Sequence, residues 1–422
     1  MRSVLVACRG RLALRTIAAC RSRGLAPIVA VASRDQQRRQ VAAADGRVEL
    51  DGATPAETYD CVESIVAAAV QCQADLVHPG CGALAEDPEL PRRLALHGIG
   101  CVGSSAAALA MAQDKSRTVA AAARLGVPVL PHATSLADLE ALVEQVGLPL
   151  VVKPLAGCLG SGVQVVRQLA ELTQALAGYA GGQGWYAERY LAEGRAVAIT
   201  VAVDAGGIAV ELGERETLLM AGGLKLLDGS PVLAVPPGLL TRIRRDARLL
   251  AAGLGLTGVA TCEFIVGPDG YFLLEVNPRL AGGYRMCEAQ TGLDVVALQL
   301  GIATGEAIAA DPVIDQAVHC LEARWYLRSA AGRAGSFERL RFPDVPGVTY
   351  DCAIEEGGSM EFDPIVVQVL STGPNPRVAA ERLVYASEAT DSSGPAHYGD
   401  HIAGWLRSEF DAMPLPSAAA TR

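Results

Sequence analysis

The first hundred residues alternate short apolar runs with longer stretches of helical periodicity. The apolar runs are residues 4–7, 28–32 and 76–77, and the helical stretches are residues 12–23 and 59–71. Strands that alternate with helices are typical of a parallel, doubly wound sheet. Such sheets bind ligands at the carboxyl ends of strands, where residues 8–11 and 78–82 are located. Glycines at a strand end also serve ordinary turns, so these segments alone do not identify a site.

A different pattern begins near residue 113. Asp114 is an acid in the first turn of a helix that runs to about residue 125, where Gly126-Val-Pro128 ends it. Residues 148–154 then form an apolar strand that contains Lys153. A lysine in such a run is rarely left unpaired, so an anionic ligand is favoured. In the small-residue segment 156–162, glycines would let backbone N–H groups surround phosphate oxygens, although a plain hairpin tip explains it equally well.

A third pattern predicts an antiparallel hairpin near residue 270. The apolar runs 259–266 and 270–274 flank the turn sequence Gly267-Pro-Asp-Gly270. This pairing allows Glu263 and Glu275 to lie side by side on one face. Two ionised carboxylates this close repel each other unless a cation lies between them, and Mg²⁺ is the usual cation beside a nucleotide.

Two further polar residues continue the same face of this hairpin. Asn277 and Arg279 follow Glu275 at intervals of two, which is the period of an extended chain. The amide adds a neutral oxygen ligand, and the guanidinium group can hold an oxyanion bidentately. Taken singly, such residues are most often solvated surface groups. Four polar groups in phase on an apolar hairpin instead favour a magnesium and phosphate site.

Composition restricts the class of protein and its partners. The chain has 422 residues, half of them hydrophobic, so we expect two or three domains with substantial cores. A net charge of −10 argues against nucleic acid or an anionic membrane as a partner. Arginines interrupt the first apolar run too early for a signal sequence, and no span approaches the ~20 apolar residues that cross a bilayer. Eleven scattered cysteines indicate neither a zinc site nor a disulfide framework, and favour the cytoplasm.

The order of these features resembles the ATP-grasp fold, in which two α+β lobes hold ATP between them. Residues 4–15, 78–82 and 101–103 also resemble the N-terminal domain of biotin carboxylases, and residues 320–324, 362–368 and 377–382 resemble their C-terminal domain. The resemblance implies a doubly wound N-terminal domain (1–112), an ATP-grasp domain (113–308) with a mobile lid at about 130–195, and an α+β C-terminal domain (309–408). Residues 409–422 are expected to be a disordered tail.

The resemblance also implies a role for each matching residue. The residues that would bind ATP are Lys115, Lys153, Gly157, Gly160, Ser161, Gly162, Glu188, Arg189, Tyr190 and Leu191. The residues that would bind one or two magnesium ions are Glu263, Glu275 and Asn277. The catalytic residues would be Arg279, Lys225 and Arg324. In this family the two lysines hold phosphates, the glycine loop closes over them, and the segment that matches residues 188–191 contacts adenine.

Three departures from the family pattern bear on function. After its arginine a biotin carboxylase has Gln-Val-Glu, whose glutamate takes the bicarbonate proton, whereas this chain has Ala281-Gly282-Gly283. The glutamine and histidine that precede the family's lysine are also missing from Met220-Ala-Gly-Gly-Leu-Lys225. Each such proton-transfer group is typically worth about 10²–10⁴-fold in rate. Ala196 stands near the position of a ribose-contacting acid or histidine, so nucleotide affinity is expected to be weaker unless Glu193 substitutes.

The sequence therefore predicts a ligase that differs from true biotin carboxylases. Asn-Pro-Arg-x-x-Gly-Gly resembles the ATP-grasp carboxylate-amine ligases, and the two glycines would make room and expose backbone N–H groups for a substrate carboxylate. The acid would become an acyl phosphate before an amine displaces phosphate. Small-molecule acids and amines are the expected substrates, without attached biotin, and a homodimer is plausible by resemblance. Two alternatives remain: a bicarbonate-dependent carboxylase that uses carboxyphosphate on a non-biotin acceptor, and a silent nucleotide-binding homologue.

Overall fold

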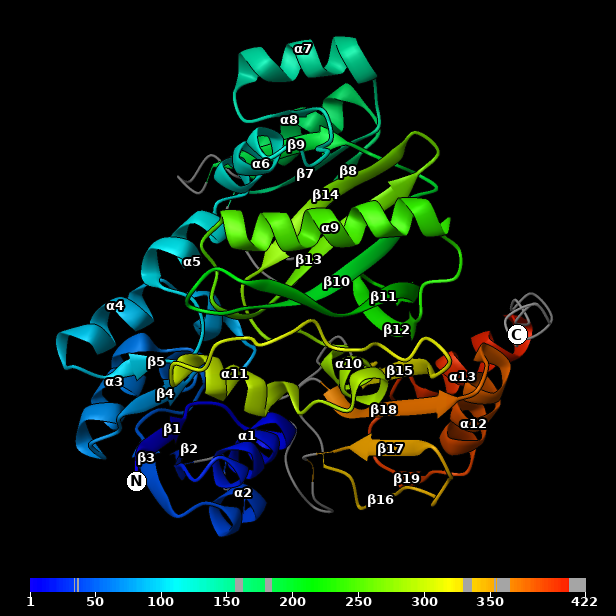
Figure 1. Cartoon of the computed structure of the whole chain (residues 1–422). Coiled ribbons are helices and arrows are strands. Elements are labelled where there is room, and N and C mark those ends of the chain that lie inside the picture. Colours follow the sequence, from blue (N-terminus) through cyan, green and yellow to red (C-terminus); the bar gives the residue numbers. More distant parts are fainter. Residues whose placement is uncertain are drawn as a thin grey trace.

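The computed structural model describes residues 1–33, 35, 38–155, 162–178, 184–328, 336–352, 354 and 365–409. Figure 1 shows three regions, each built on one β-sheet. A sheet with surrounding helices contains the N-terminus, a small sheet lies at the opposite end of the molecule, and a long sheet connects the centre to the C-terminal region.

The N-terminal sheet is entirely parallel. Its strands are β1 (Ser3–Val6), β2 (Ala26–Ala32), β3 (Gly46–Leu50), β4 (Leu76–His78) and β5 (Gly100–Cys101), in the order β3-β2-β1-β4-β5. Its helices are α1 (Gly10–Ser22), α2 (Arg38–Ala43), α3 (Val62–Gln71) and α4 (Glu89–Leu96). This confirms the predicted doubly wound sheet. Because β1 and β4 are neighbours at the reversal of strand order, residues 8–11 and 78–82 follow adjacent strand ends.

A short 3-10 helix, η2 (Ala83–Glu86), continues from the end of β4 and carries Glu86 toward the rest of the molecule. Two helices, α5 (Ala106–Gln113) and α6 (Lys115–Arg124), then lead out of this region. Asp114 is the N-cap of α6 and not a residue of its first turn, because its side chain accepts the Arg117 N–H at 3.1 Å. The cap fixes the first helical residue as Lys115.

The small sheet is antiparallel and lies within the range expected for the lid. Its strands are β6 (His132–Ala133), β7 (Leu150–Pro154), β8 (Gln164–Val166) and β9 (Trp185–Arg189), in the order β6-β9-β7-β8. Helices α7 (Leu136–Val146) and α8 (Leu169–Gly178) cover it through buried leucines, among them Leu139, Leu142 and Leu172. This separate apolar core makes the small sheet a compact unit of its own.

The long sheet has eight antiparallel strands in the order β14-β13-β10-β11-β12-β15-β18-β17. The strands are β10 (Arg195–Val203), β11 (Ala209–Ala221), β12 (Leu224–Ser230), β13 (Gly258–Gly267), β14 (Gly270–Asn277), β15 (His319–Tyr326), β17 (Val348–Asp351) and β18 (Ile365–Gly373). Because β12 pairs with β15, one sheet crosses the expected boundary between the ATP-grasp and C-terminal domains. The short strands β16 (Arg339–Arg341) and β19 (Asp391–Ser393) pair separately.

Helices cover the long sheet and decide which face is polar. Helix α9 (Pro237–Gly253) lies across the strands β13 and β10 in Figure 1, and its buried Leu250 shares a core with Cys262 and Phe264. Alternation along β13 then turns Glu263 to the opposite face. Helices α10 (Tyr284–Thr291) and α11 (Val295–Ala303) follow β14, while α12 (Pro376–Glu388) and α13 (Gly399–Glu409) pack on the C-terminal strands. Helix α13 includes Glu409, the first residue assigned to the tail, and residues 410–422 lie outside the described part.

Candidate active site

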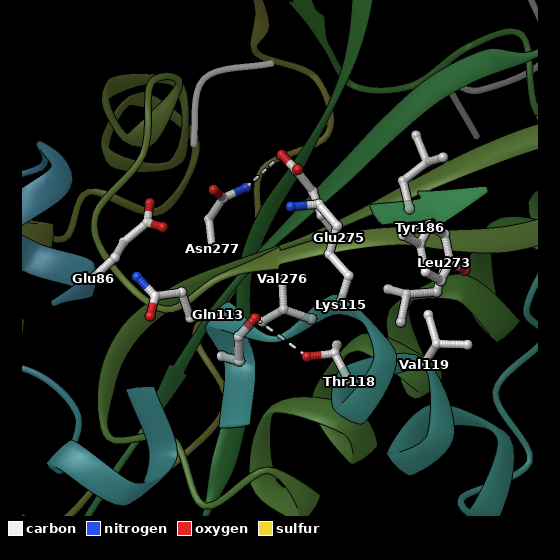
Figure 2. A pocket seen from close by; sticks show the side chains of 12 residues that line it. Glu86, Gln113, Lys115, Thr118, Val119, Tyr186, Leu273, Glu275, Val276 and Asn277 are labelled. Atoms are coloured by element: carbon white, nitrogen blue, oxygen red, sulfur yellow. Dashed lines mark hydrogen bonds between the residues drawn. The ribbon is translucent and has the colours of Figure 1, made fainter. Parts of the chain in front are cut away.

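The hairpin of β13 and β14 brings the predicted magnesium ligands together. Glu263 and Glu275 are direct cross-strand partners, and Thr261 pairs with Asn277, which confirms the predicted register. The Asn277 amide donates to Glu275 Oε1 at 3.2 Å and to Glu263 Oε1 at 3.5 Å. Figure 2 shows the Asn277 and Glu275 side chains lying side by side above β14. The buried apolar residues on the other face of β13 hold this pair in place.

A pocket opens beside these carboxylates (Figure 2). It is lined by Glu86, Ala112, Gln113, Lys115, Thr118, Val119, Tyr186, Leu273, Leu274, Glu275, Val276 and Asn277. The lining comes from η2, α5, α6, β9 and β14. Residues from the N-terminal region, the small sheet and the long sheet therefore meet at this pocket. Burial lowers the pKa of Lys115, although the nearby carboxylate of Glu275 acts in the opposite direction. The lining holds two carboxylates, Glu86 and Glu275, and one lysine, so a phosphate that carries its own cation would suit its balance of charge.

Lys153 lies in a strand, β7, as predicted, but its anionic partner is a protein carboxylate. Its Nζ donates to Glu188 Oε1 at 2.6 Å, and both side chains are buried. Nζ also lies 5.2 Å from the centre of the Tyr186 ring, across from Lys153 in β9. The burial of Lys153 therefore does not by itself require a ligand, because β7 and β9 supply its counter-ion.

The predicted adenine segment is partly engaged by the protein itself. The Glu188 side chain points to Lys153, and the N–H groups of Arg189 and Tyr190 donate to the Pro131 and Pro149 carbonyls at 3.1 and 3.4 Å. The Leu191 carbonyl accepts the Gly194 N–H at 3.2 Å. The adenine contact stays a prediction. Of the glycine loop, Gly162 is exposed with a φ of 75°, and Gly157, Gly160 and Ser161 lie outside the described residues.

Arg279 is held by a residue that sequence reasoning missed. Its Nε donates to Glu86 Oε1 at 2.5 Å, and its Nη2 donates to Asn277 Oδ1 at 3.2 Å. Glu86 comes from η2 in the N-terminal region, 193 positions away in sequence. Its only sequence signal is that it follows the glycine-rich strand end at 78–82. The contact ties the N-terminal region to the predicted phosphate site.

A row of buried charges continues from Glu263 across the long sheet. Glu263 and Arg215 both pair with Ala198, and farther along Asp228 pairs with Glu322, so these side chains share one face. Lys225 and Arg324 reach into the same row. We call these residues the polar stripe: Glu263, Arg215, Lys225, Asp228, Glu322 and Arg324. Arg215, Asp228 and Glu322 were not predicted, because only strand pairing brings them to the site.

The polar stripe is internally paired. Lys225 Nζ lies 2.5 Å from Glu263 Oε2, and Arg215 Nε lies 3.3 Å from Asp228 Oδ2. Arg324 Nη2 lies 2.7 Å from the same Asp228 oxygen and 3.0 Å from Glu322 Oε1. Burial alone would raise the pKa of Asp228, but the guanidinium groups of Arg324 and Arg215 outweigh it and hold that pKa below its usual value. The Asp228 carboxylate is therefore kept as an anion by its two arginine partners.

The structure corrects the prediction that the glycines at 282 and 283 leave open space. A β-carbon on Gly282 would lie 2.7 Å from Arg324 Nη2, and one on Gly283 would lie 2.6 Å from Arg215 Cδ. The Gly283 N–H also donates to Glu322 Oε1 at 3.0 Å. Arg324 and Arg215 occupy the space beside Gly282 and Gly283, because a glycine has only a hydrogen atom in place of a side chain.

The fold and the pocket together are those of an ATP-grasp protein, because the pocket lies between a small sheet that contributes Tyr186 and a long sheet that contributes Glu275 and Asn277. Two family models agree. Residues 1–109 match the biotin carboxylase N-terminal domain, and residues 114–310 match the ATP-binding domain of the carbamoyl-phosphate synthase L chain.

Curated relatives and solved structures identify the family. Biotin carboxylase 2 of Bacillus subtilis is 29% identical over 398 residues, which cover 90% of each chain. The biotin-dependent acyl-coenzyme A carboxylase alpha3 subunit of Mycobacterium leprae is 30% identical over 93% of this chain and 69% of that one. The chain therefore belongs to the biotin carboxylase family.

The solved structures extend the likeness to three dimensions. Biotin carboxylase of Campylobacter jejuni superimposes with a TM-score of 0.91 at 24% identity, over 97% of this chain and 96% of that one. The biotin carboxylase domain of Hydrogenobacter thermophilus 2-oxoglutarate carboxylase, a dimer with MgADP, ADP and bicarbonate, gives 0.90 at 25% identity over 97% and 95%. These matches confirm the predicted architecture, and the ligands of the second agree with the predicted ATP and Mg²⁺. None of the described helices is both long and apolar enough to span a bilayer.

Proposed function

We propose that this protein is an ATP-dependent ligase that activates a carboxylate as an acyl phosphate and transfers the acyl group to an amine. The observation that carries the proposal is the turn after Arg279. Biotin carboxylases place a proton-accepting glutamate there, whereas Ala281-Gly282-Gly283 has no side chain that can accept a proton. Arg215 and Arg324 occupy the space instead.

The residues present fit a magnesium site. Glu263 and Glu275 present carboxylate oxygens side by side, the kind of ligand that Mg²⁺ prefers, and the Asn277 oxygen, which here accepts from Arg279, would join them once its amide rotates. The described residues contain no set of three or more His, Cys, Asp or Glu side chains that could hold a metal alone. This arrangement suits an ion that takes its remaining ligands from nucleotide phosphates and water. When bound, the ion would neutralise charge on the transferring phosphoryl group.

The chain's own residues would position the reactants around that cluster. Lys115 and Lys153 would hold phosphate oxygens, and Arg279, fixed by Glu86 and Asn277, would stabilise the charge on the transferring group. A carboxylate oxygen forms a bond to the γ-phosphorus as the bond from that phosphorus to ADP breaks. The amine nitrogen then forms a bond to the carbonyl carbon, phosphate leaves, and the amine proton passes to phosphate or water.

Lys225 is the group best placed to receive the substrate carboxylate. Its side chain is 31% exposed, whereas the side chains of Arg215 and Arg324 are each 6% exposed. In the ligand-free arrangement Glu263 holds its Nζ. Because Glu263 is also a predicted metal ligand, binding of the ion would withdraw that partner and leave Lys225 to the incoming acid. Arg324 would act by positioning the stripe and not by contact with substrate.

The proposal includes the wider organisation of the protein. We assign domains to residues 1–112, 113–308 and 309–408, with small-molecule acids and amines as substrates in the cytoplasm. The dimer described for the Hydrogenobacter thermophilus domain supports a homodimer here.

A second candidate is a bicarbonate-dependent carboxylase that uses carboxyphosphate on an acceptor other than biotin. The relatives favour it, because the Bacillus subtilis biotin carboxylase and the Mycobacterium leprae subunit align over at least 90% of this chain. The missing glutamate at position 283 speaks against it, since bicarbonate must lose its proton before it can attack a phosphate readily.

Formation of ADP in bicarbonate-depleted buffer separates the two candidates. We expect a panel of small organic acids, with an amine such as glycine or ammonia, to stimulate ADP and phosphate release without bicarbonate. Release that requires bicarbonate and responds to no organic acid would overturn the ligase proposal. Glu275→Gln in the same assay controls for contaminating ATPases, because it removes a magnesium ligand.

A further inference from the structure

Resting on the proposed function, we infer that the activated acid is a monocarboxylate whose carboxylate binds Lys225 and whose apolar side chain lies beside Met220, on the hairpin of β11 and β12. The hairpin is fixed by its turn. Ala221 pairs with Leu224 around Gly222 and Gly223, whose φ angles of 57° and 81° are those of a type I′ turn. Met220 and Lys225 are the next cross-strand pair.

Part of this hairpin packs on the C-terminal core, and Met220 and Lys225 lie on the side that faces Glu263. Leu218, Leu219, Ala221 and Leu224 are partly buried against the C-terminal core, and the strand pairing is irregular between Leu219 and Met220. Met220 is 51% exposed, and cross-strand partners share a face, so its side chain lies on the side from which Lys225 reaches Glu263. From Thr217 to Leu224 the hairpin has no charged residue. A substrate whose carboxylate binds Lys225 therefore meets an apolar surface next to it.

The charges of the polar stripe limit how many acidic groups the substrate can carry. The stripe has three cations, Arg215, Lys225 and Arg324, and three anions, Glu263, Asp228 and Glu322, all within ion-pair distance of a partner. Withdrawal of Glu263 by a metal releases one cation, Lys225. One released cation matches one carboxylate. A second carboxylate or an ammonium group on the substrate side chain would be desolvated without a partner there.

Four probe acids test this inference: 4-methylpentanoate and L-leucine as apolar acids, glutarate and L-asparagine as polar counterparts of similar size. We expect both apolar acids to stimulate ADP release with a KM at least about tenfold below the polar ones. Calorimetric titration of the same acids into protein with Mg²⁺ and a non-hydrolysable ATP analogue should give the same order. Without the nucleotide and Mg²⁺, binding of the apolar acids should weaken, because Glu263 then holds Lys225.

Two variants at Met220 and a control at Leu249 locate the effect. Met220→Ser should raise KM for the apolar acids about tenfold with kcat preserved, and Met220→Leu should restore it. Leu249→Ser changes a side chain of similar exposure, 41%, on helix α9, and should leave KM unchanged. Equal KM values for polar and apolar acids, or no response to Met220→Ser, would overturn the inference while the ligase proposal stands. Turnover with bicarbonate alone would overturn both.

Discussion

Gly283 lies directly against Arg215: a β-carbon at position 283 would be 2.6 Å from Arg215 Cδ, and the glycine has a φ of 90°. Under the proposed function, position 283 corresponds to the proton-accepting glutamate of biotin carboxylases. In this chain both the backbone angle and the neighbouring arginine disfavour such a side chain. The glycine at position 283 is therefore matched to the packing of its neighbours.

Gly283→Glu is accordingly expected to destabilise the protein without producing bicarbonate-dependent activity. The strained backbone and the contact with Arg215 should together cost about 2–4 kcal/mol in free energy of unfolding. Chemical denaturation measures this cost. Gly283→Ala and Gly292→Ala form a matched pair, because Gly292 has a φ of 71° but no atom within 4 Å of an added β-carbon. A smaller cost at position 283 than at 292 would contradict the packing argument.

The buried pair of Lys153 and Glu188 should be sensitive to loss of one partner. Lys153→Met leaves the Glu188 carboxylate buried without its counter-ion and should cost about 3–5 kcal/mol. The double variant Lys153→Met, Glu188→Leu should recover most of that stability and still fail to bind ATP. The exposed pair Arg407 and Glu388 is the control, where Arg407→Met should cost less than about 1 kcal/mol. Nucleotide binding by the double variant would contradict the assigned role of Lys153.

Glu275→Gln should affect magnesium dependence more than folding. Removing one of the paired carboxylates is expected to lower kcat about 10²–10³-fold and to move the Mg²⁺ titration to higher concentration. Thermal unfolding should stay near that of the parent protein, since Glu275 is only partly buried. Glu49→Gln, with a side chain 68% exposed on β3, is the control. An unchanged Mg²⁺ titration would exclude Glu275 as a ligand.

Glu211 should make stability depend on pH. Burial raises the pKa of its carboxyl from 4.5 to about 7, while the nearby Arg244 acts in the opposite direction. The folded state then holds a proton that the unfolded chain has lost, so this contribution to stability is full below about pH 4.5 and is lost as pH rises through about 7. Relative to Glu211→Gln, the parent protein should lose up to about 3 kcal/mol over this range. Parallel pH curves for the two proteins would contradict the shift.

Much of the site could be predicted from the sequence because its residues belong to one short hairpin. The interval of two between Glu275, Asn277 and Arg279 and the turn at residues 267–270 predict a hairpin, and cross-strand pairing of Glu263 with Glu275 follows from its register. Likewise, alternating strands and helices predict a parallel N-terminal sheet. Such inferences succeed when backbone periodicity alone fixes which side chains share a face.

Contacts between distant segments could not be predicted in this way. Glu86 reaches Arg279 from another region, and Glu188 supplies the counter-ion that Lys153 was expected to take from a ligand. Nothing in the local pattern of either segment indicates these pairs. The Lys153 pair forms within the small sheet, where β7 lies beside β9, and the Arg279 pair forms where the N-terminal region meets the long sheet. Both places are buried, and an unpaired charge is costly there.

The turn at Ala281-Gly282-Gly283 shows both sides of this division. By itself the sequence determined that no proton-accepting side chain stands there, because residue identity needs no structure. Only the tertiary structure decided what takes its place. Pairing of β10, β11, β12 and β15 aligns Arg215, Asp228, Glu322 and Arg324 in one row, and this turn packs on that row. Strand register brings together residues more than a hundred positions apart, and it is fixed by burial across the whole sheet.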